Sequence, residues 1–188
     1  MPDEGWWRAL WPDPARVLSQ AGIVGDHDAI DLCAGDGWFT VPIAKRSRHV
    51  FAIDIDEEML ARARRRCGEN RIGNASFIAG DAYDVATLVP APVDYVFLAN
   101  AFHGVPDKAR LARSIRAALK PGGRLGIVNW HARPRAETTV LGEPRGPATE
   151  LRMTPEATAA CVEAAGFVLR VVVDVSPHHY AAVFWNEG

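Results

Sequence analysis

Several features that would place a protein in a special class are missing from this sequence of 188 residues. It has three cysteines and no Cys-x-x-Cys pair, which argues against a disulfide framework or a structural zinc site. No apolar run approaches the roughly 20 residues of a membrane span, and the opening MPDEG does not resemble a secretory signal. We therefore expect a cytoplasmic protein without a membrane partner.

The chain also lacks a strong charge of either sign. Its 21 basic and 23 acidic side chains leave a formal charge of -2, so composition gives no electrostatic case for a nucleic-acid partner. The 48% of hydrophobic and 23% of charged residues are typical of a globular domain, and the length fits one such domain. We expect a monomer or a homodimer.

From residue 29 onward, apolar segments alternate with helical patterns. Strands are predicted over 29–33, 49–54, 75–79, 93–99 and 124–130. Helices are predicted over 38–46, 57–67, 108–119 and from residue 155 to a stop at Gly166. Several of these strands are continuous apolar runs, which is typical of strands buried on both faces of a parallel sheet. The two last apolar runs, 167–175 and 180–185, are too close for a crossover helix and must pair antiparallel.

Two segments lie outside this alternation. Residues 1–26 are aromatic and proline-rich, with a predicted helix over 14–21, and we interpret them as a cap on a domain that spans residues 27–188. Segment 131–153 contains three prolines and two glycines and is predicted to be a long loop. Loops of this length in a compact domain are usually functional or mobile. Three tryptophans of the cap could cover a ligand or could pack as a hydrophobic lid: Trp6, Trp7 and Trp11.

A glycine turn joins the first predicted strand to the first helix. Glycines allow a sharp turn and a close approach of a ligand beside a helix N-terminus. The frame Gly35-Asp36-Gly37-Trp-Phe-Thr40 lacks the third small residue of a dinucleotide fingerprint, and Asp36 would repel a pyrophosphate. An adenosine-containing ligand without a phosphate fits this turn better.

Hydrogen-bond acceptors follow the next three predicted strands. Asp54 ends the second strand, where a carboxylate can accept both ribose hydroxyls, and such charge-assisted bonds contribute about 1.5–3 kcal/mol each. Asp81 follows the third strand and Asn100 the fourth. Each could be an ordinary surface residue or cap. Their joint position at the carboxyl ends of parallel strands, beside the glycine turn, favours a binding site.

Six segments together resemble the class I (Rossmann-like) S-adenosylmethionine-dependent methyltransferases, and most closely the small-molecule group that includes ubiquinone/menaquinone and arsenite methyltransferases. These segments cover 31–37, 52–60, 79–82, 100–107, 119–123 and 154–156. The three separate cysteines do not match an arsenic-binding set, which argues against arsenite as the methyl acceptor. The resemblance implies an α/β fold, a three-layer α/β/α sandwich with a mostly parallel seven-stranded sheet and an antiparallel C-terminal strand.

The resemblance also implies S-adenosylmethionine as the cofactor and assigns its contacts. It places Asp31 and Gly35 near the methionine portion, Asp54 on the ribose, Asp81 with Ala82 on the adenine, and Asn100 beside the reacting methyl. Further expected cofactor contacts are Cys33, Ala34, Gly37 and Ile55. Cys33 stands where many relatives have glycine, although other small residues also occur there.

The resulting hypothesis is methyl transfer to a small-molecule acceptor by in-line displacement. No Asn-Pro-Pro-Tyr-like motif, typical of enzymes that methylate base amino groups, follows the fourth strand, where Asn100-Ala-Phe-His103 stands instead. The alternative is a sensor or scaffold that binds S-adenosylmethionine without transferring its methyl group. For the methyltransferase hypothesis we expect a compact acceptor pocket under residues 1–22 and the 131–153 loop.

Catalysis of such a displacement needs a general base only where the acceptor must lose a proton. His103 is the candidate base, with a satisfied turn histidine as the alternative. Acceptor contacts are predicted for Trp7, His131, His178 and Tyr180, although histidines in a hairpin are more often solvated. No metal site is expected. A basic cluster on the second predicted helix is interpreted as a solvated face: Arg62, Arg64, Arg65 and Arg66.

Overall fold

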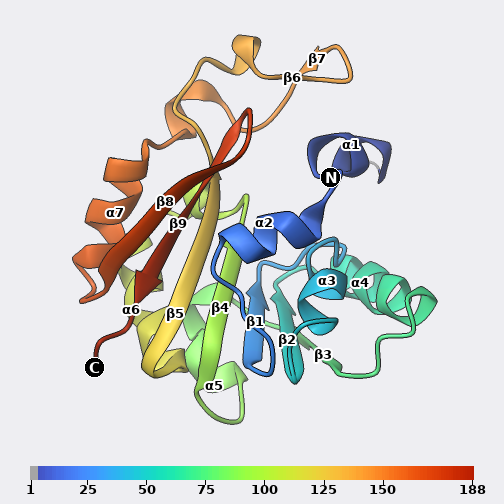
Figure 1. Ribbon diagram of the computed structural model, residues 1–188, viewed down its shortest axis with the longest axis vertical. Helices are drawn as coiled ribbons and strands as arrows, with labels where there is room; N and C mark the ends of the chain where they lie inside the picture. The colour runs from blue at the N-terminus through green and yellow to red at the C-terminus, as the bar shows by residue number, and fades with distance from the viewer. Residues whose placement is uncertain (1–3) are drawn as a thin grey trace.

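A seven-stranded sheet forms the middle of the molecule, with helices on both of its faces (Figure 1). The computed structural model describes residues 4–188. The strands lie in the order β3-β2-β1-β4-β5-β9-β8. Their bounds are β1 Asp28–Leu32, β2 His49–Asp54, β3 Ala75–Ala79, β4 Val93–Ala99, β5 Leu119–Trp130, β8 Val168–Ser176 and β9 His179–Trp185. The pairs among β1 to β5 are parallel, and β9 is antiparallel to both β5 and β8, which confirms the predicted fold class.

The helices form two layers, each with its own hydrophobic core. Their bounds are α1 Glu4–Leu10, α2 Pro14–Gln20, α3 Thr40–Ala44, α4 Glu57–Glu69, α5 Val85–Leu88, α6 Lys108–Ala118 and α7 Pro155–Glu163. One core contains Leu111 of α6 and Val162 of α7, and the other contains Leu18 of α2 and Ile43 of α3. Burial on both faces explains why the strands read as continuous apolar runs.

Two predicted helix boundaries are wrong for local reasons. The helix after the glycine turn begins at Thr40 rather than at residue 38, because Gly37, at φ +81°, still belongs to the turn. A Cβ atom at Gly37 would lie 2.8 Å from Cα of Ala63, so this glycine lets α4 pack closely. Helix α4 continues past Gly68 to Glu69 and ends where Arg71 adopts φ +58°.

The N-terminal segment packs into the same molecule as the sheet. Trp11 is 1% exposed, and its ring contacts Phe39 and His179 at centroid distances of 5.5 and 4.4 Å. The first three residues of the predicted cap lie outside the described residues. In the described part of the chain, no helix is both long and apolar enough to cross a membrane.

Segment 131–153 is more ordered than the predicted loop. It contains a small hairpin of β6 Thr139–Val140 and β7 Glu143–Pro144, and Figure 1 shows this hairpin and α1 above the same edge of the sheet. The buried guanidinium of Arg152 holds the segment together, since it donates to Oγ1 of Thr138 and to the carbonyl of Arg145, each at 2.8 Å.

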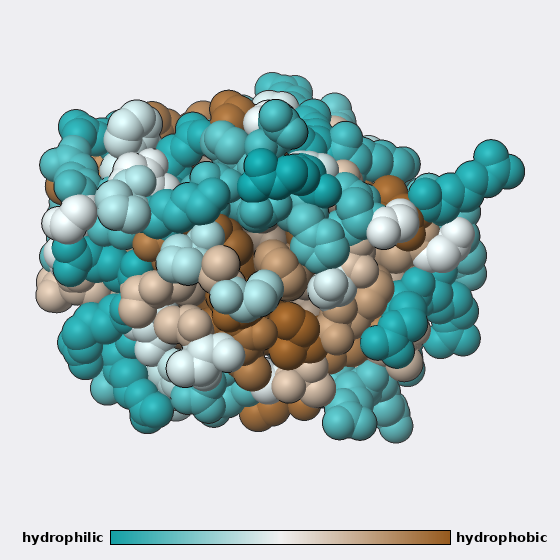
Figure 2. All heavy atoms as spheres, turned by 90° about the horizontal axis from the view of Figure 1, so that it is seen from below, coloured by the Kyte–Doolittle hydropathy of each residue, from teal (hydrophilic) through white to brown (hydrophobic). Residues whose placement is uncertain are grey.

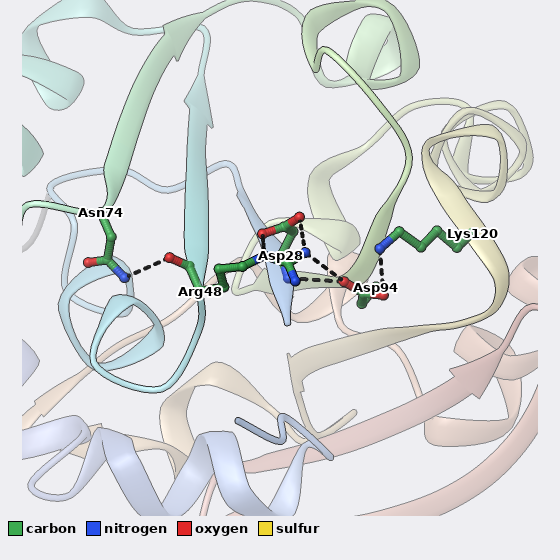
Figure 3. A network of polar contacts seen from close by, with 5 residues as sticks. All are labelled: Asp28, Arg48, Asn74, Asp94 and Lys120. Carbon is green, nitrogen blue, oxygen red and sulfur yellow. Dashed lines mark hydrogen bonds and ion pairs between the residues drawn. The ribbon is translucent and has the colours of Figure 1, made fainter. Parts of the chain in front are cut away.

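A polar network closes the amino edge of the sheet (Figure 3). Nε of Arg48 donates to Asp28 at 2.9 Å, and the backbone N–H of Asp28 donates to Asp94 at 3.0 Å. Lys120 Nζ donates to the other oxygen of Asp94 at 2.8 Å, and the side-chain amide of Asn74 donates to the Arg48 carbonyl at 3.3 Å. Figure 2 shows this end from below, with apolar residues in the middle and a mostly hydrophilic rim.

Candidate functional site

The glycine turn after β1 has the backbone that a close ligand approach requires. Cys33, Gly35 and Gly37 all have positive φ, at +57°, +54° and +81°. A left-handed conformation favours glycine, which explains why a glycine would also suit the Cys33 position. Burial raises the pKa of the Cys33 thiol to about 12, so the thiol stays neutral.

Two side chains tie this turn to neighbouring elements. Oδ2 of Asp54, at the end of β2, accepts a hydrogen bond from the backbone N–H of Gly35 at 2.8 Å. Arg66 of α4 pairs with Asp36 at 2.8 Å and lies over the ring of Trp38 at 5.0 Å. Arg66 therefore differs from the solvated role predicted for its cluster, whereas Arg62, Arg64 and Arg65 are exposed.

Two adjoining cavities lie at this carboxyl edge of the sheet. The first has a volume of about 350 Å³ and includes in its wall Cys33, Asp54, Ile55, Asp81, Ala82 and Gly104. The second has a volume of about 280 Å³ and includes Trp7, Asp31, Ala34, Gly35, Asp56 and Asn100. Both cavities share Cys33, Asp54 and Ala101. The structure thus brings together the predicted cofactor residues except Gly37, which packs against α4 instead.

The second cavity is acidic. Asp31, Asp36, Asp54 and Asp56 lie in its wall. Burial raises the pKa of Asp31 from 3.8 to about 7, although Oγ1 of Thr40 donates a hydrogen bond to its carboxylate at 2.6 Å. The nearby charges of Asp54 and Asp36 raise it further. A cationic ligand would relieve this repulsion.

Three observations test whether S-adenosylmethionine fits these cavities. Both side-chain polar atoms of Asn100 are buried, and neither finds a hydrogen-bond partner in residues 4–188. Ile55 is 73% exposed, an unusual position for a large apolar side chain, and it lies at the first cavity. The carboxylates of the second cavity suit the two cationic groups of the cofactor, its α-ammonium and its sulfonium. The residues therefore fit the cofactor.

A third cavity lies between α1 and segment 131–153, where the sequence predicts the acceptor. Its volume is about 450 Å³, and its wall contains Trp6, Trp7, Asn100, His103, Trp130, Arg135, Arg145, Gly146 and Pro147. Trp7 and Asn100 also belong to the wall of the second cavity. These two residues therefore mark the junction between the cofactor and acceptor regions.

His103 has the geometry of a neutral base. Its Nδ1 lies 3.0 Å from Oδ1 of Asn129, which also accepts the backbone N–H of Trp130 at 3.1 Å. Since that oxygen can only accept, Nδ1 of His103 carries the hydrogen and Nε2 keeps its lone pair. Burial lowers the pKa of His103 below its ordinary value of 6.5, which the Asn129 bond opposes, so the ring is neutral near pH 7.

Both histidines predicted to contact the acceptor, His131 and His178, lie outside the wall of the third cavity. Nε2 of His131 pairs with Asp174 of β8 at 3.0 Å. His178 stacks on the ring of Trp130 at 6.2 Å between centroids, and its Nε2 lies 3.3 Å from the Thr139 carbonyl. Both side chains support the β8–β9 turn and the 131–153 segment, and neither belongs to the cavity wall.

Tyr180 is fully buried on the other face of the sheet. Its hydroxyl lies 2.7 Å from Oγ1 of Thr158 on α7, and the residue belongs to the core of the α6–α7 layer. Side chains alternate between faces along β9, so Ala181 faces the opposite layer. The structure therefore does not bring Tyr180 to the third cavity.

The sequence pattern did not single out five residues of the third cavity: Trp130, Arg135, Arg145, Gly146 and Pro147. The segment that contains both arginines was predicted only as a functional loop, without individual residues. Among residues 4–188 there is no group of three His, Cys, Asp or Glu side chains that could hold a metal ion.

Comparison with known proteins gives a consistent picture. The family described as "Methyltransferase domain" matches residues 29–123, half of the chain. The chain is 28% identical over 124 residues to the tRNA 5-carboxymethoxyuridine methyltransferase of Escherichia coli (strain K12), which covers 65% of this chain and 47% of that protein. It is 29% identical over 174 residues to the ubiquinone biosynthesis O-methyltransferase of Aeromonas salmonicida (strain A449), covering 88% of this chain and 71% of that protein.

The chain thus spans about half the length of the E. coli relative. Among solved structures, a SAM-dependent methyltransferase from Aquifex aeolicus superposes with a TM-score of 0.81 at 21% identity, covering 98% of this chain and 94% of that one. This likeness establishes the fold that the two chains share.

Proposed function

The chain belongs to the family of class I S-adenosylmethionine-dependent methyltransferases, and from this membership we propose that it transfers a methyl group to a small-molecule acceptor. The observation that carries the proposal is the junction at Trp7 and Asn100, where the acidic second cavity meets the third. A volume of about 450 Å³ lies within the roughly 300–1,000 Å³ of small-molecule sites.

The first two cavities would hold the cofactor. The free lone pairs of Asp54 would accept the ribose hydroxyls, Asp81 and Ala82 would contact the adenine, and Asp31 would face the α-ammonium of the amino-acid end. When bound, S-adenosylmethionine supplies a methyl group on a sulfonium, a leaving group that needs no acid. The side-chain amide of Asn100 would gain the partners it lacks and orient the reactants at the junction.

The residues around the acceptor would contribute to catalysis by orienting the acceptor and by accepting one proton from it. Orientation of the two reactants can supply about 7–11 kcal/mol of barrier reduction. Nε2 of His103 would take a proton from an acceptor hydroxyl or amine, while Asn129 holds the ring by Nδ1. The apolar faces of Trp6, Trp7 and Trp130 would exclude water from this region.

A labelling experiment tests the proposal. The protein is incubated with methyl-labelled S-adenosylmethionine and, in parallel, with a metabolite extract or with total tRNA. We expect a labelled product of low mass. Total tRNA is included because the name of the E. coli relative specifies tRNA for that protein. Label in RNA alone would contradict the proposal of a small-molecule acceptor. Cofactor binding without any labelled product would instead support a sensor or scaffold.

A further inference from the structure

The third cavity is bordered by arginines that have no acidic partner. Arg135 and Arg145 belong to its wall, and the guanidinium of Arg152 lies directly behind the wall, 5.0 Å from the centroid of the Trp130 ring. No carboxylate of the described residues lies within ion-pair distance of these three side chains. Nε of Arg135 donates to the Gly146 carbonyl at 3.1 Å, and Arg152 binds only carbonyl and hydroxyl oxygens.

Some arginines elsewhere in the described chain have acidic partners, and the arginines of the third cavity are distinguished by their place beside a cavity. Arg48 pairs with Asp28, Arg66 with Asp36, and Arg170 with Glu187. A buried cation without a counter-charge is costly, and Arg152 is 7% exposed with its Nη1 buried and unpartnered in the described structure. The charges around the third cavity therefore leave a positive field that an anion can satisfy. The second cavity, with its four aspartates, has the opposite sign.

The aromatic part of the third cavity's wall favours ligands of a flat shape. Trp6, Trp7 and Trp130 line the cavity, with the rings of Trp6 and Trp7 4.8 Å apart at their centroids. Indole faces favour flat, conjugated ligands. A guanidinium presents a planar fork of donors that matches a carboxylate, which a lysine would not do.

We propose that the acceptor is a flat, conjugated small molecule with a carboxylate, bound by Arg135 and Arg145 between the tryptophans of the third cavity. This proposal rests on the proposed function and names the substrate class of that site. The carboxylate anchors the acceptor at the arginine side of the cavity, and the nucleophilic atom lies toward Asn100 and His103, at the junction with the cofactor cavity.

Matched ligand pairs test the inference without any need for turnover. The probes are benzoate, cinnamate and indole-3-acetate, each compared with its neutral amide, in the presence of saturating S-adenosylhomocysteine. Binding is followed by tryptophan fluorescence, because three tryptophans line the cavity, and by calorimetry. We expect at least one carboxylate to bind tenfold or more tightly than its amide. The absence of such a preference in all three pairs, including the absence of binding, would overturn the proposal.

Variants assign the preference to the arginines. Arg135→Gln with Arg145→Gln should abolish it, whereas Arg133→Gln, a matched loss of charge in the same segment outside the cavity wall, should retain it. Arg145 accepts hydrogen bonds through its backbone carbonyl, and its side chain makes no hydrogen bond or ion pair with the described residues, so Arg145→Glu alone should fold and should reverse the preference. A preference that survives in the double variant would contradict the assignment.

The two proposals fail in different ways. Neither Arg135 nor Arg145 lies in the cofactor cavities, so every variant should bind S-adenosylhomocysteine as the wild type does. A carboxylate preference without methyl transfer in the labelling experiment would overturn the enzymatic function and leave the anion site. Methyl transfer to neutral acceptors alone would contradict the proposed carboxylate site and would leave the proposed methyltransferase function supported.

Discussion

The polar groups at the amino edge of the central sheet are paired with one another, whereas several at the carboxyl edge have no partner among residues 4–188. At the amino edge, Asp28, Arg48, Asp94 and Lys120 satisfy one another (Figure 3). At the carboxyl edge, the amide of Asn100 is buried without a partner in the described structure. Asp31 is held there with a raised pKa, and three arginines lack a carboxylate.

This difference distinguishes polar groups that stabilise the fold from polar groups that are available to a ligand. Paired polar groups connect strand ends and contribute to stability, whereas unpaired buried groups cost stability unless a ligand completes them. Substitutions at the amino edge should therefore change the free energy of unfolding and leave binding intact. Substitutions at the carboxyl edge should change binding or catalysis, and at the buried carboxylate of Asp31 they should also change the pH dependence of stability.

The largest expected effect is at His103. His103→Gln removes the proton acceptor but keeps a side chain that can bond to Asn129, so we expect methyl transfer to fall about 100-fold while cofactor affinity stays constant. The measurement is the rate of label transfer to the acceptor found in the labelling experiment, with His49→Gln, near the amino edge, as the control. A rate that stays within twofold of the wild type would remove the base role.

The pH dependence of stability tests Asp31. Its pKa in the folded protein, about 7, lies above its ordinary value of 3.8, so the folded state binds the extra proton between these values. The contribution of Asp31 to stability is therefore complete at low pH and is lost as the pH rises through about 7.

Asn cannot ionise, so Asp31→Asn should become more stable than the wild type as the pH rises. We expect the difference in free energy of unfolding to grow by about 3 kcal/mol between pH 5 and pH 8, since about two pK units separate pH 5 from the folded pKa and each corresponds to about 1.4 kcal/mol. Urea unfolding of both ligand-free proteins at the two pH values measures it. Parallel behaviour of the two proteins would show that Asp31 ionises normally.

Asp54 tests the cofactor end. Asp54→Ala should weaken S-adenosylmethionine binding at least tenfold, about 1.4 kcal/mol, because the ribose hydroxyls lose their acceptor. Calorimetry measures the dissociation constant, and circular dichroism confirms the fold. Asp84→Ala is the control, because the exposed Asp84 carboxylate caps no helix. An unchanged dissociation constant in Asp54→Ala would refute the ribose assignment.

The smallest effect belongs to the amino edge. Asp94→Ala removes the acceptor for Lys120 and for the backbone N–H of Asp28, so we expect a loss of about 1 kcal/mol in the free energy of unfolding. Cofactor affinity should not change. Urea unfolding and calorimetry on the same sample make the comparison. Weaker cofactor binding at unchanged stability would erase the contrast between the two edges.

The strands and the cofactor edge could be predicted because their signals are local. Apolar runs mark buried strands, and Asp54, Asp81 and Asn100 follow strands whose ends must meet at one edge. Helix α5 was missed because its four residues, Val85–Leu88, are too few for a periodic pattern.

The acceptor end depends on contacts between distant parts of the chain. Arg135 and Arg145 reach the third cavity only because Arg152 folds segment 131–153 over α1. Tyr180 was expected at the acceptor because it lies next to the β8–β9 turn. Its direction depends on the register of β9, in which a shift by one residue exchanges the two faces.

We infer that an acidic cofactor region and a basic acceptor region meet at Asn100 and Trp7. A crystal structure with S-adenosylhomocysteine would show this junction. We expect the adenosine between Asp54 and Asp81, the homocysteine amine near Asp31, and the sulfur at the junction, facing the cavity that contains His103. A ligand bound elsewhere, or a sulfur turned away from that cavity, would contradict it.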